Sequence, residues 1–134
     1  MKFFIFLIPA LLMLASCRIL SVNEEDQDLT GKEWTIIAIA QKPVDLDKKA
    51  FFKLDEKGKI GGKAACNSFS GSYEKGANNQ IRFSDIVSTK MYCEGLMDEE
   101  NQIVMNLQQV KNYKVKTGML YLFNGSELLL TLKR

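Results

Sequence analysis

The sequence predicts a mainly β fold (α+β), a small antiparallel β-barrel or strongly curved sheet of about eight or nine strands with one helix packed on it. Turn residues recur at short intervals and separate short apolar or alternating runs, which is typical of consecutive strands. Only residues 96–110 place apolar side chains at helical spacing. The chain has 134 residues, of which 46% are hydrophobic and 25% charged, so we expect a folded chain of one domain.

The chain begins with the pattern of an exported leader. Met1 and Lys2 give a positive start, and residues 3–14 form an uncharged apolar run that contains Pro9. As a helix, this run would span roughly 18 Å, against about 30 Å for the hydrocarbon core of a bilayer. Residues 1–16 are therefore predicted to be a signal peptide rather than a membrane span.

A lipoprotein motif follows the apolar run. The sequence Leu14-Ala15-Ser16-Cys17 resembles the bacterial lipobox, in which the cysteine becomes the mature N-terminus. The resemblance implies that Cys17 carries a diacylglyceryl thioether and an acylated amine, because two or three acyl chains hold a protein on a bilayer where one does not. Arg18 rather than Asp follows, which favours the outer membrane in the enterobacterial sorting rule, and we expect its periplasmic face. A soluble secreted protein with a chance cysteine is the alternative.

Residues 17–28 are predicted to form a flexible acidic tether. Residues 21–28 read SVNEEDQD, with four acids and no base, so they cannot bury enough apolar surface to fold. The tether would hold the domain away from the lipid headgroups. Export to the cell surface is an alternative, because acidic runs near a lipidated cysteine direct some lipoproteins there.

Residues 29–134 are predicted to form one domain, since no repeat or linker interrupts them. The first strand is expected over residues 34–40, and a turn at Lys42-Pro43 ends it. Further turns are expected at residues 55–58 and 76–79, which are rich in Gly, Asn and charged residues. The next strands are predicted at 50–54, 59–64, 70–74, 80–84 and 86–91.

One helix and a three-stranded meander are predicted after that. About four turns of helix fit residues 96–110, because four apolar residues share one helical face: Leu96, Ile103, Leu107 and Val110. The last strands are expected at 113–116, 119–123 and 126–132. Asn124-Gly125 favours a hairpin, because a type I′ turn requires positive φ at both central residues. Residues 119–123 are apolar on both faces, which predicts a strand covered from both sides.

The composition excludes several classes of function. There is no histidine, so Ser–His and Cys–His nucleophiles and imidazole metal ligands are ruled out. Three cysteines cannot form a four-thiolate zinc site. A net charge of +2, from 18 basic and 16 acidic residues, is too balanced for a nucleic-acid binder. We therefore expect no catalytic residue, no metal or other cofactor, and no nucleic-acid partner.

The two remaining cysteines form a natural pair in an exported protein. With Cys17 lipidated, Cys66 and Cys93 are left to form a disulfide. Closing a loop of that length contributes roughly 3–4 kcal/mol of stability in the chain-entropy model. Two free buried thiols that pack as small apolar residues are the alternative.

A compound pattern runs through the same region. Its members are Trp34, Cys66-Asn67, Ser70-Gly71, Tyr73, Thr89 with Cys93, and Glu100 with Ile103 and Leu107. Together they resemble the META domain, the HslJ-like family of heat-shock-inducible bacterial lipoproteins, over residues 29–134. The resemblance implies a small β domain with one helix, associated with stress tolerance and with no established biochemical activity. Where the family commonly has Gly, this chain has Ala65, so we expect no strained backbone there.

The motif residues admit structural and functional interpretations. Asn67 and Ser70 are expected to flank a corner clamped by the disulfide, with Gly71 adopting positive φ; a binding loop is the alternative. Glu100 shares the apolar face of the helix, so a buried carboxylate would need hydrogen bonds or a cation, from Asn67, Thr89 or Lys90. The alternatives for Glu100 are a solvated position in the first helical turn and a functional acid.

The leading hypothesis for function is a non-enzymatic, lipid-anchored envelope domain. We expect a monomer that binds an envelope protein partner or supports stress or antibiotic tolerance. The alternative is a carrier of a small apolar ligand inside a β-barrel, supported by the number of strands and the supply of Phe, Leu and Ile.

Overall fold

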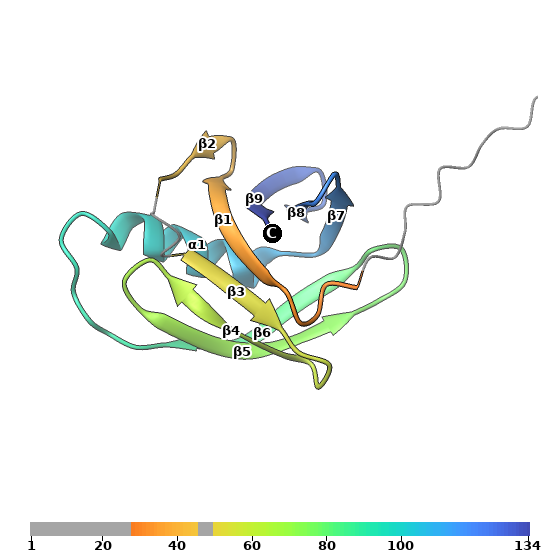
Figure 1. Cartoon of the computed structure of the whole chain (residues 1–134), viewed down its shortest axis with the longest axis horizontal. Coiled ribbons are helices and arrows are strands. Elements are labelled where there is room, and N and C mark those ends of the chain that lie inside the picture. Colours follow the sequence, from red (N-terminus) through yellow and green to blue (C-terminus); the bar gives the residue numbers. More distant parts are fainter. Residues whose placement is uncertain (1–27, 46–49) are drawn as a thin grey trace, which may run out of the picture.

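The computed structural model describes residues 28–45 and 50–134, and it confirms the predicted fold class (Figure 1). Nine antiparallel strands form one strongly curled half-barrel sheet with a single helix packed on it in this part of the chain. The elements are β1 (Glu33–Ile39), β2 (Lys42–Pro43), β3 (Ala50–Leu54), β4 (Lys59–Ala64), β5 (Ser68–Lys75), β6 (Ile81–Ser88), α1 (Met97–Gln109), β7 (Asn112–Lys116), β8 (Met119–Asn124) and β9 (Glu127–Lys133). Cys17, the predicted signal peptide and all but the last residue of the predicted tether lie outside the described residues.

Strand β1 joins the two halves of the sheet. The order is β6-β5-β4-β3-β1-β9-β8-β7, so β1 lies between the N-terminal strands and the C-terminal meander. The two outer strands meet at one end of the half-barrel only. There the Ile81 amide donates to the Lys111 carbonyl at 3.1 Å, and the Tyr113 amide donates to the Asn79 carbonyl at 2.9 Å. Beyond this point β6 has no strand partner on its outer side among the described residues.

The core fills the concave side of the sheet. Alternate residues of each strand point inward, and the rings of Phe52 and Phe83 lie 6.0 Å apart between their centroids. Helix α1 contacts β1, β4, β6 and β9, which belong to both halves of the sheet. It buries Ile103 and Leu107 completely, so the helix occupies the interior that a closed barrel would leave for a ligand.

Three details of the predicted strands are wrong. Lys42–Pro43 is not a turn but the short strand β2, which pairs back on β1 after a turn at Ala40, where φ is 52°. The strands predicted at 80–84 and 86–91 are one strand, β6, bent by a bulge at Asp85, where φ is 54°. Residues 89–91 leave the sheet: the Thr89 amide still donates to the Ser68 carbonyl of β5 at 3.0 Å, but the backbone of Met91 is bound by the Asn67 side chain instead of by a strand.

The prediction that β8 is covered from both sides is also wrong. Leu120 and Leu122 point inward and are fully buried, but the alternate residues on the outer face are only partly buried. Among the described elements, β8 contacts chiefly its neighbours in the sheet, β7 and β9. Local hydrophobicity is the same on the two faces, so only the placement of the helix decides which of them is buried.

Candidate functional site

The central feature of the predicted motif is a buried network around Asn67 and Glu100. Both residues are almost fully buried, with 1% and 4% of their surface exposed. The Glu100 carboxylate accepts hydrogen bonds from the backbone amides of Cys66 (2.8 Å) and Asn67 (2.6 Å) and from the Asn67 side-chain amide. Three donors offset much of the cost of desolvating the carboxylate.

The position of Glu100 fits the predicted buried, hydrogen-bonded role and not the solvated one. The carboxylate is buried and hydrogen-bonded, and it also lies in the first turn of α1, where the positive end of the helix dipole favours a negative charge. Asn67 binds it directly, whereas Thr89 acts on it only through Asn67. Lys90 is exposed and forms no ion pair with it in the described part of the chain. Burial and three bound donors leave this carboxylate no access to a substrate.

Asn67 connects this carboxylate to the loop between β6 and α1, residues 89–96, which we call the 89–96 loop. The Asn67 Oδ1 atom accepts hydrogen bonds from the Thr89 hydroxyl and the Met91 amide, both at 2.7 Å. Its Nδ2 atom donates to the Met91 carbonyl at 2.9 Å as well as to Glu100. Every hydrogen-bonding position of the Asn67 amide is therefore used, which fixes its orientation.

A disulfide and a second backbone contact complete the fixation of the 89–96 loop. Cys66 and Cys93 are joined in a disulfide, with 5.8 Å between their Cα atoms. The Cys93 amide also faces the Met97 sulfur at 3.4 Å. The loop has no regular secondary structure, yet it is fixed at Thr89, Met91 and Cys93. The corner after β4, the loop and the helix start thus form one rigid unit.

The backbone at this corner differs from the expectation. Ala65 adopts φ of 97° and is buried, so the residue that stands where the family commonly has Gly is strained. The adjacent amides of Cys66 and Asn67 must both point at Glu100, and this requirement overrides the preference of an L-residue for negative φ.

Ser70 and Gly71 lie in strand β5 rather than at the corner. Gly71 does not have positive φ; a Cβ atom there would lie 2.7 Å from the Ser84 carbonyl and 2.6 Å from the Ile86 side chain. Its role is to let β6 approach closely at the Asp85 bulge. Ser70 is exposed and pairs with Gly61 and Val87 across the sheet.

Two aromatic motif residues secure other parts of the fold. The indole nitrogen of Trp34 donates to the Leu29 carbonyl at 3.1 Å, which ties the start of the domain to the core. The Tyr73 hydroxyl donates to the Asp55 carbonyl and holds the turn between β3 and β4. Burial raises the pKa of Tyr73, because the phenolate would lose hydration there.

The sequence did not single out the exposed apolar residues beside the network. Val87, Met91 and Tyr92 are 64%, 57% and 79% exposed, and they follow one another from the end of β6 into the 89–96 loop. The signal in the sequence that could have indicated them was the apolar pair Met91-Tyr92, which lies between polar residues. Its exposure could not be predicted, because it depends on Asn67 holding the backbone of Met91.

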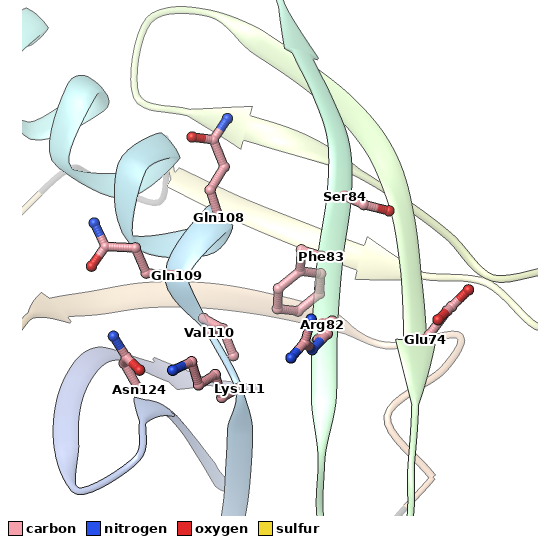
Figure 2. A pocket seen from close by; sticks show the side chains of 9 residues that line it. All are labelled: Glu74, Arg82, Phe83, Ser84, Gln108, Gln109, Val110, Lys111 and Asn124. Carbon is pink, nitrogen blue, oxygen red and sulfur yellow. The ribbon is translucent and has the colours of Figure 1, made fainter.

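The clefts of the described surface do not form a catalytic constellation. One cleft of about 490 Å³ opens between β6 and the end of α1, and Figure 2 shows its side chains directed to different sides rather than toward one point. Lys111 is directed toward Asn124, and Arg82 lies beside Phe83. A second cleft, of about 570 Å³, has a charged rim that includes Lys53, Asp55 and Glu56. Both open at the surface, so neither supports the predicted apolar-ligand carrier.

Two further features bear on the class of the protein. Among residues 28–45 and 50–134, no three acidic or cysteine side chains come together in a group that could hold a metal ion. The same residues include no helix of the length and hydrophobicity needed to cross a membrane.

Comparison with known proteins identifies a family and several solved structures that are similar to this chain. The family model described as the META domain matches residues 27–134. A protein solved by NMR is 24% identical, with a TM-score of 0.62, and the match covers 84% of this chain and 94% of that chain. An NMR structure of a protein from Burkholderia xenovorans is 21% identical, with a TM-score of 0.64, and covers 79% of this chain and 83% of that one.

A third similar structure is a duf4847 family protein from Bacteroides vulgatus, 10% identical with a TM-score of 0.58, covering 78% of this chain and 93% of that chain. At these identities the solved structures show a shared fold and nothing about activity. A search of curated proteins found no match. The family model confirms the resemblance predicted from the motif, and it covers every described strand, the helix and the Asn67–Glu100 network: the chain belongs to the META domain family.

Proposed function

We propose that this META domain is a non-enzymatic, lipid-anchored module of the bacterial cell envelope that binds another envelope protein through the 89–96 loop and the end of β6. The observation that carries the proposal is a rigid loop with exposed apolar side chains. Val87, Met91 and Tyr92 are each more than half exposed, whereas the backbone of Met91 is bound on both sides by Asn67.

The energetics favour a docking role for these side chains. Each large apolar side chain contributes about 1.5–3 kcal/mol when it is fully buried. A rigid loop has already lost the conformational entropy that a flexible loop would lose on binding. Tyr and Met are also enriched at the centres of protein interfaces. The motif residues thus act on function indirectly, by holding the loop in the geometry that a partner meets.

The lipid anchor and the absence of catalysis rest on separate observations. The anchor is supported by the Leu14-to-Cys17 motif, which lies outside the described residues. The non-enzymatic assignment is supported by the absence of histidine and by the full occupation of the Glu100 carboxylate. Mass spectrometry of protein from its own host tests the anchor, and an unmodified Cys17 peptide with the leader attached would contradict it.

Site-specific photocrosslinking in the native envelope tests the docking surface. A photoreactive phenylalanine derivative placed at Tyr92 should yield one discrete adduct, and a second probe at Val87 should yield the same adduct. A probe at Glu56, which is exposed in the turn between β3 and β4, serves as the control. Equal labelling of the same proteins from position 56 would refute the assignment of the surface.

A matched pair of methionine variants sharpens this test. Met91 and Met105 are both 57% exposed, but Met105 lies on α1 outside the proposed surface. Met91→Ala should reduce the yield of the Tyr92 adduct several-fold, while Met105→Ala should leave it unchanged. Equal effects of the two substitutions would show that exposed methionines in general, rather than this loop, bind the partner.

A further inference from the structure

The outer side of strand β6, away from β5, is paired at its start and then borders a cleft. The Ile81 amide donates to the Lys111 carbonyl at 3.1 Å. The adjoining residues, Gln80 and Asn112, form an antiparallel bridge. From Arg82 onward, no strand of the described chain lies on this side of β6. The cleft of about 490 Å³ between β6 and the end of α1 lies there (Figure 2).

The pairing stops because the chain on the other side changes its structure. Residues 111–113 run antiparallel to the start of β6, but they follow directly on a helix. Helix α1 ends at Gln109, and Val110 is the one extended residue that joins the helix to this pairing. A helix cannot continue the ladder of a strand, so the residues of β6 after Ile81 face the cleft instead of a neighbouring strand.

The backbone of Phe83 presents a donor and an acceptor on this side. In an antiparallel strand, the N–H and C=O groups of one residue point to the same side, and successive residues alternate. Pairing with β5 is regular from Ile81 to Ser84, so Phe83 points outward as Ile81 does. Phe83 also lines the cleft. Neither backbone group of Phe83 has a hydrogen-bond partner on this side within the described residues.

The far wall and the far end of the cleft limit what can bind there. Gln108 lies in the last turn of α1, lines the cleft and is exposed. Its side-chain amide can donate and accept, and no hydrogen bond to a described residue uses it. Asp85 forms a bulge with φ of 54°, so the regular part of the β6 edge ends at Ser84. The site therefore has room for a short segment only.

We propose that the outer edge of β6, residues 81–84, binds a short extended peptide segment of another protein, which adds as an antiparallel strand opposite Phe83. A residue opposite Phe83 can exchange two backbone hydrogen bonds with it. The outer edge of the added segment then faces Gln108. The site lies at the start of β6, whereas the docking surface proposed above follows its end, so the two proposals are independent.

The lining of the cleft favours a peptide over other occupants. Phe83 and Val110 are 6% and 3% exposed, so the cleft offers little apolar surface to a hydrophobic ligand. Arg82 lies directly opposite Glu74 across the strands, and the lining thus carries both signs of charge. Unpaired backbone groups remain as the main binding feature, and an extended peptide is the ligand that matches them. Recognition is then mainly through the main chain and tolerant of sequence.

Amide hydrogen exchange measured by NMR tests this edge with a defined peptide. The chain starts at residue 17 with Cys17→Ser, which omits the apolar leader and keeps the whole matched META domain. The probe is a short blocked peptide of alternating threonine and valine with a lysine at each end. At a peptide concentration about ten times its Kd, exchange of the Phe83 amide should slow roughly tenfold. Unchanged exchange at Phe83 would overturn the proposal.

A control peptide separates strand addition from side-chain contact. It has the same sequence with N-methylated backbone amides, so it keeps the side chains but has no N–H donor. This peptide should leave the exchange of the Phe83 amide unchanged. Equal slowing by the two peptides would show that side chains alone bind, which would overturn strand addition.

A matched pair of helix variants locates the bound peptide. Gln108 and Gln102 are both exposed on α1, but only Gln108 lines the cleft. Gln108→Trp fills the cleft and should weaken peptide binding at least roughly tenfold, while Gln102→Trp should leave it unchanged. An unaltered spectrum of the 89–96 loop shows that each variant is folded. Equal affinities of the two variants would overturn the assignment of the site.

The same spectra keep this inference apart from the docking surface. Amide signals of the 89–96 loop should not shift when the peptide is added, so each proposal can fail without the other. Slow exchange at Phe83 in the chain without peptide would show that the chain itself or a second copy already pairs with the β6 edge. That result would overturn the proposal, and a dependence on protein concentration would identify the second copy.

Discussion

Replacing Glu100 by Gln keeps the size and shape of the side chain but exchanges one acceptor oxygen for an amide that donates. The remaining oxygen can still accept from the Cys66 and Asn67 backbone amides, although as a neutral and weaker acceptor. The new amide faces the Nδ2 donor of Asn67. Asn67 cannot rotate to present its oxygen, because Oδ1 already binds Thr89 and Met91.

The cost of the substitution can be worked from these contacts. A buried donor left without an acceptor costs about 1–3 kcal/mol, and the loss of charge weakens two further hydrogen bonds by up to about 1 kcal/mol each. Part of this is offset, because a neutral side chain is less costly to bury than a carboxylate. We expect Glu100→Gln to lower the free energy of unfolding by about 2–4 kcal/mol, or the melting temperature by roughly 10–20 °C.

Denaturant unfolding followed by circular dichroism measures this change, with Glu99→Gln as the matched control. Glu99 is half-exposed in the same helical turn, so its substitution removes the same charge and should cost no more than about 1 kcal/mol. If the two variants lose equal stability, the charge acts only through the helix dipole, and the buried hydrogen bonds of Glu100 add nothing to it.

Three further predictions concern the motif and its neighbours. Tyr73→Phe should cost about 0.5–1.5 kcal/mol at neutral pH through the lost hydrogen bond to Asp55. The raised pKa of Tyr73 adds stability that is fully present below pH 10 and is lost as the pH rises through the folded pKa, so the wild-type chain should lose more stability than Tyr73→Phe in alkaline denaturation. Gly71→Ala should destabilise by about 1–3 kcal/mol, measured by thermal unfolding, and an unchanged melting temperature would refute the close approach of β6. Ala65→Gly and Ala64→Gly each remove a buried methyl group, but only Ala65→Gly also removes the strain of positive φ. Ala65→Gly should therefore be about 1–2 kcal/mol more stable in denaturant than Ala64→Gly. Equal losses of stability in the two variants would contradict backbone strain at Ala65.

The motif residues show where sequence reasoning is sufficient and where it fails. Glu100 falls on the apolar face of a helix, so its spacing alone indicates that it must be buried with donors or lie exposed in the first turn. Ala65 is the opposite case, since its identity argues against positive φ, yet two amides that bind one carboxylate impose it. Asp85 similarly resembles a break between two strands in the sequence, whereas cross-strand pairing continues past it as a bulge.

The sequence by itself determined the succession of most strands along the chain, the single helix, a hairpin between the last two strands and the membership of the META family, because periodicity and turn chemistry act over a few neighbouring residues. The predicted Asn124-Gly125 turn is wrong in its position: Asn124 ends β8 and pairs with Glu127, so Gly125 and Ser126 are the central residues, and only Gly125 has positive φ (64°). Tertiary structure alone decided which carboxylate-binding amides converge at the corner, why the 89–96 loop is rigid without secondary structure, and which face of β8 stays open to solvent. These properties depend on residues more than twenty positions apart in the chain, such as Asn67 and Met91, whose contact exists only once the sheet has curled and α1 has closed over its concave side.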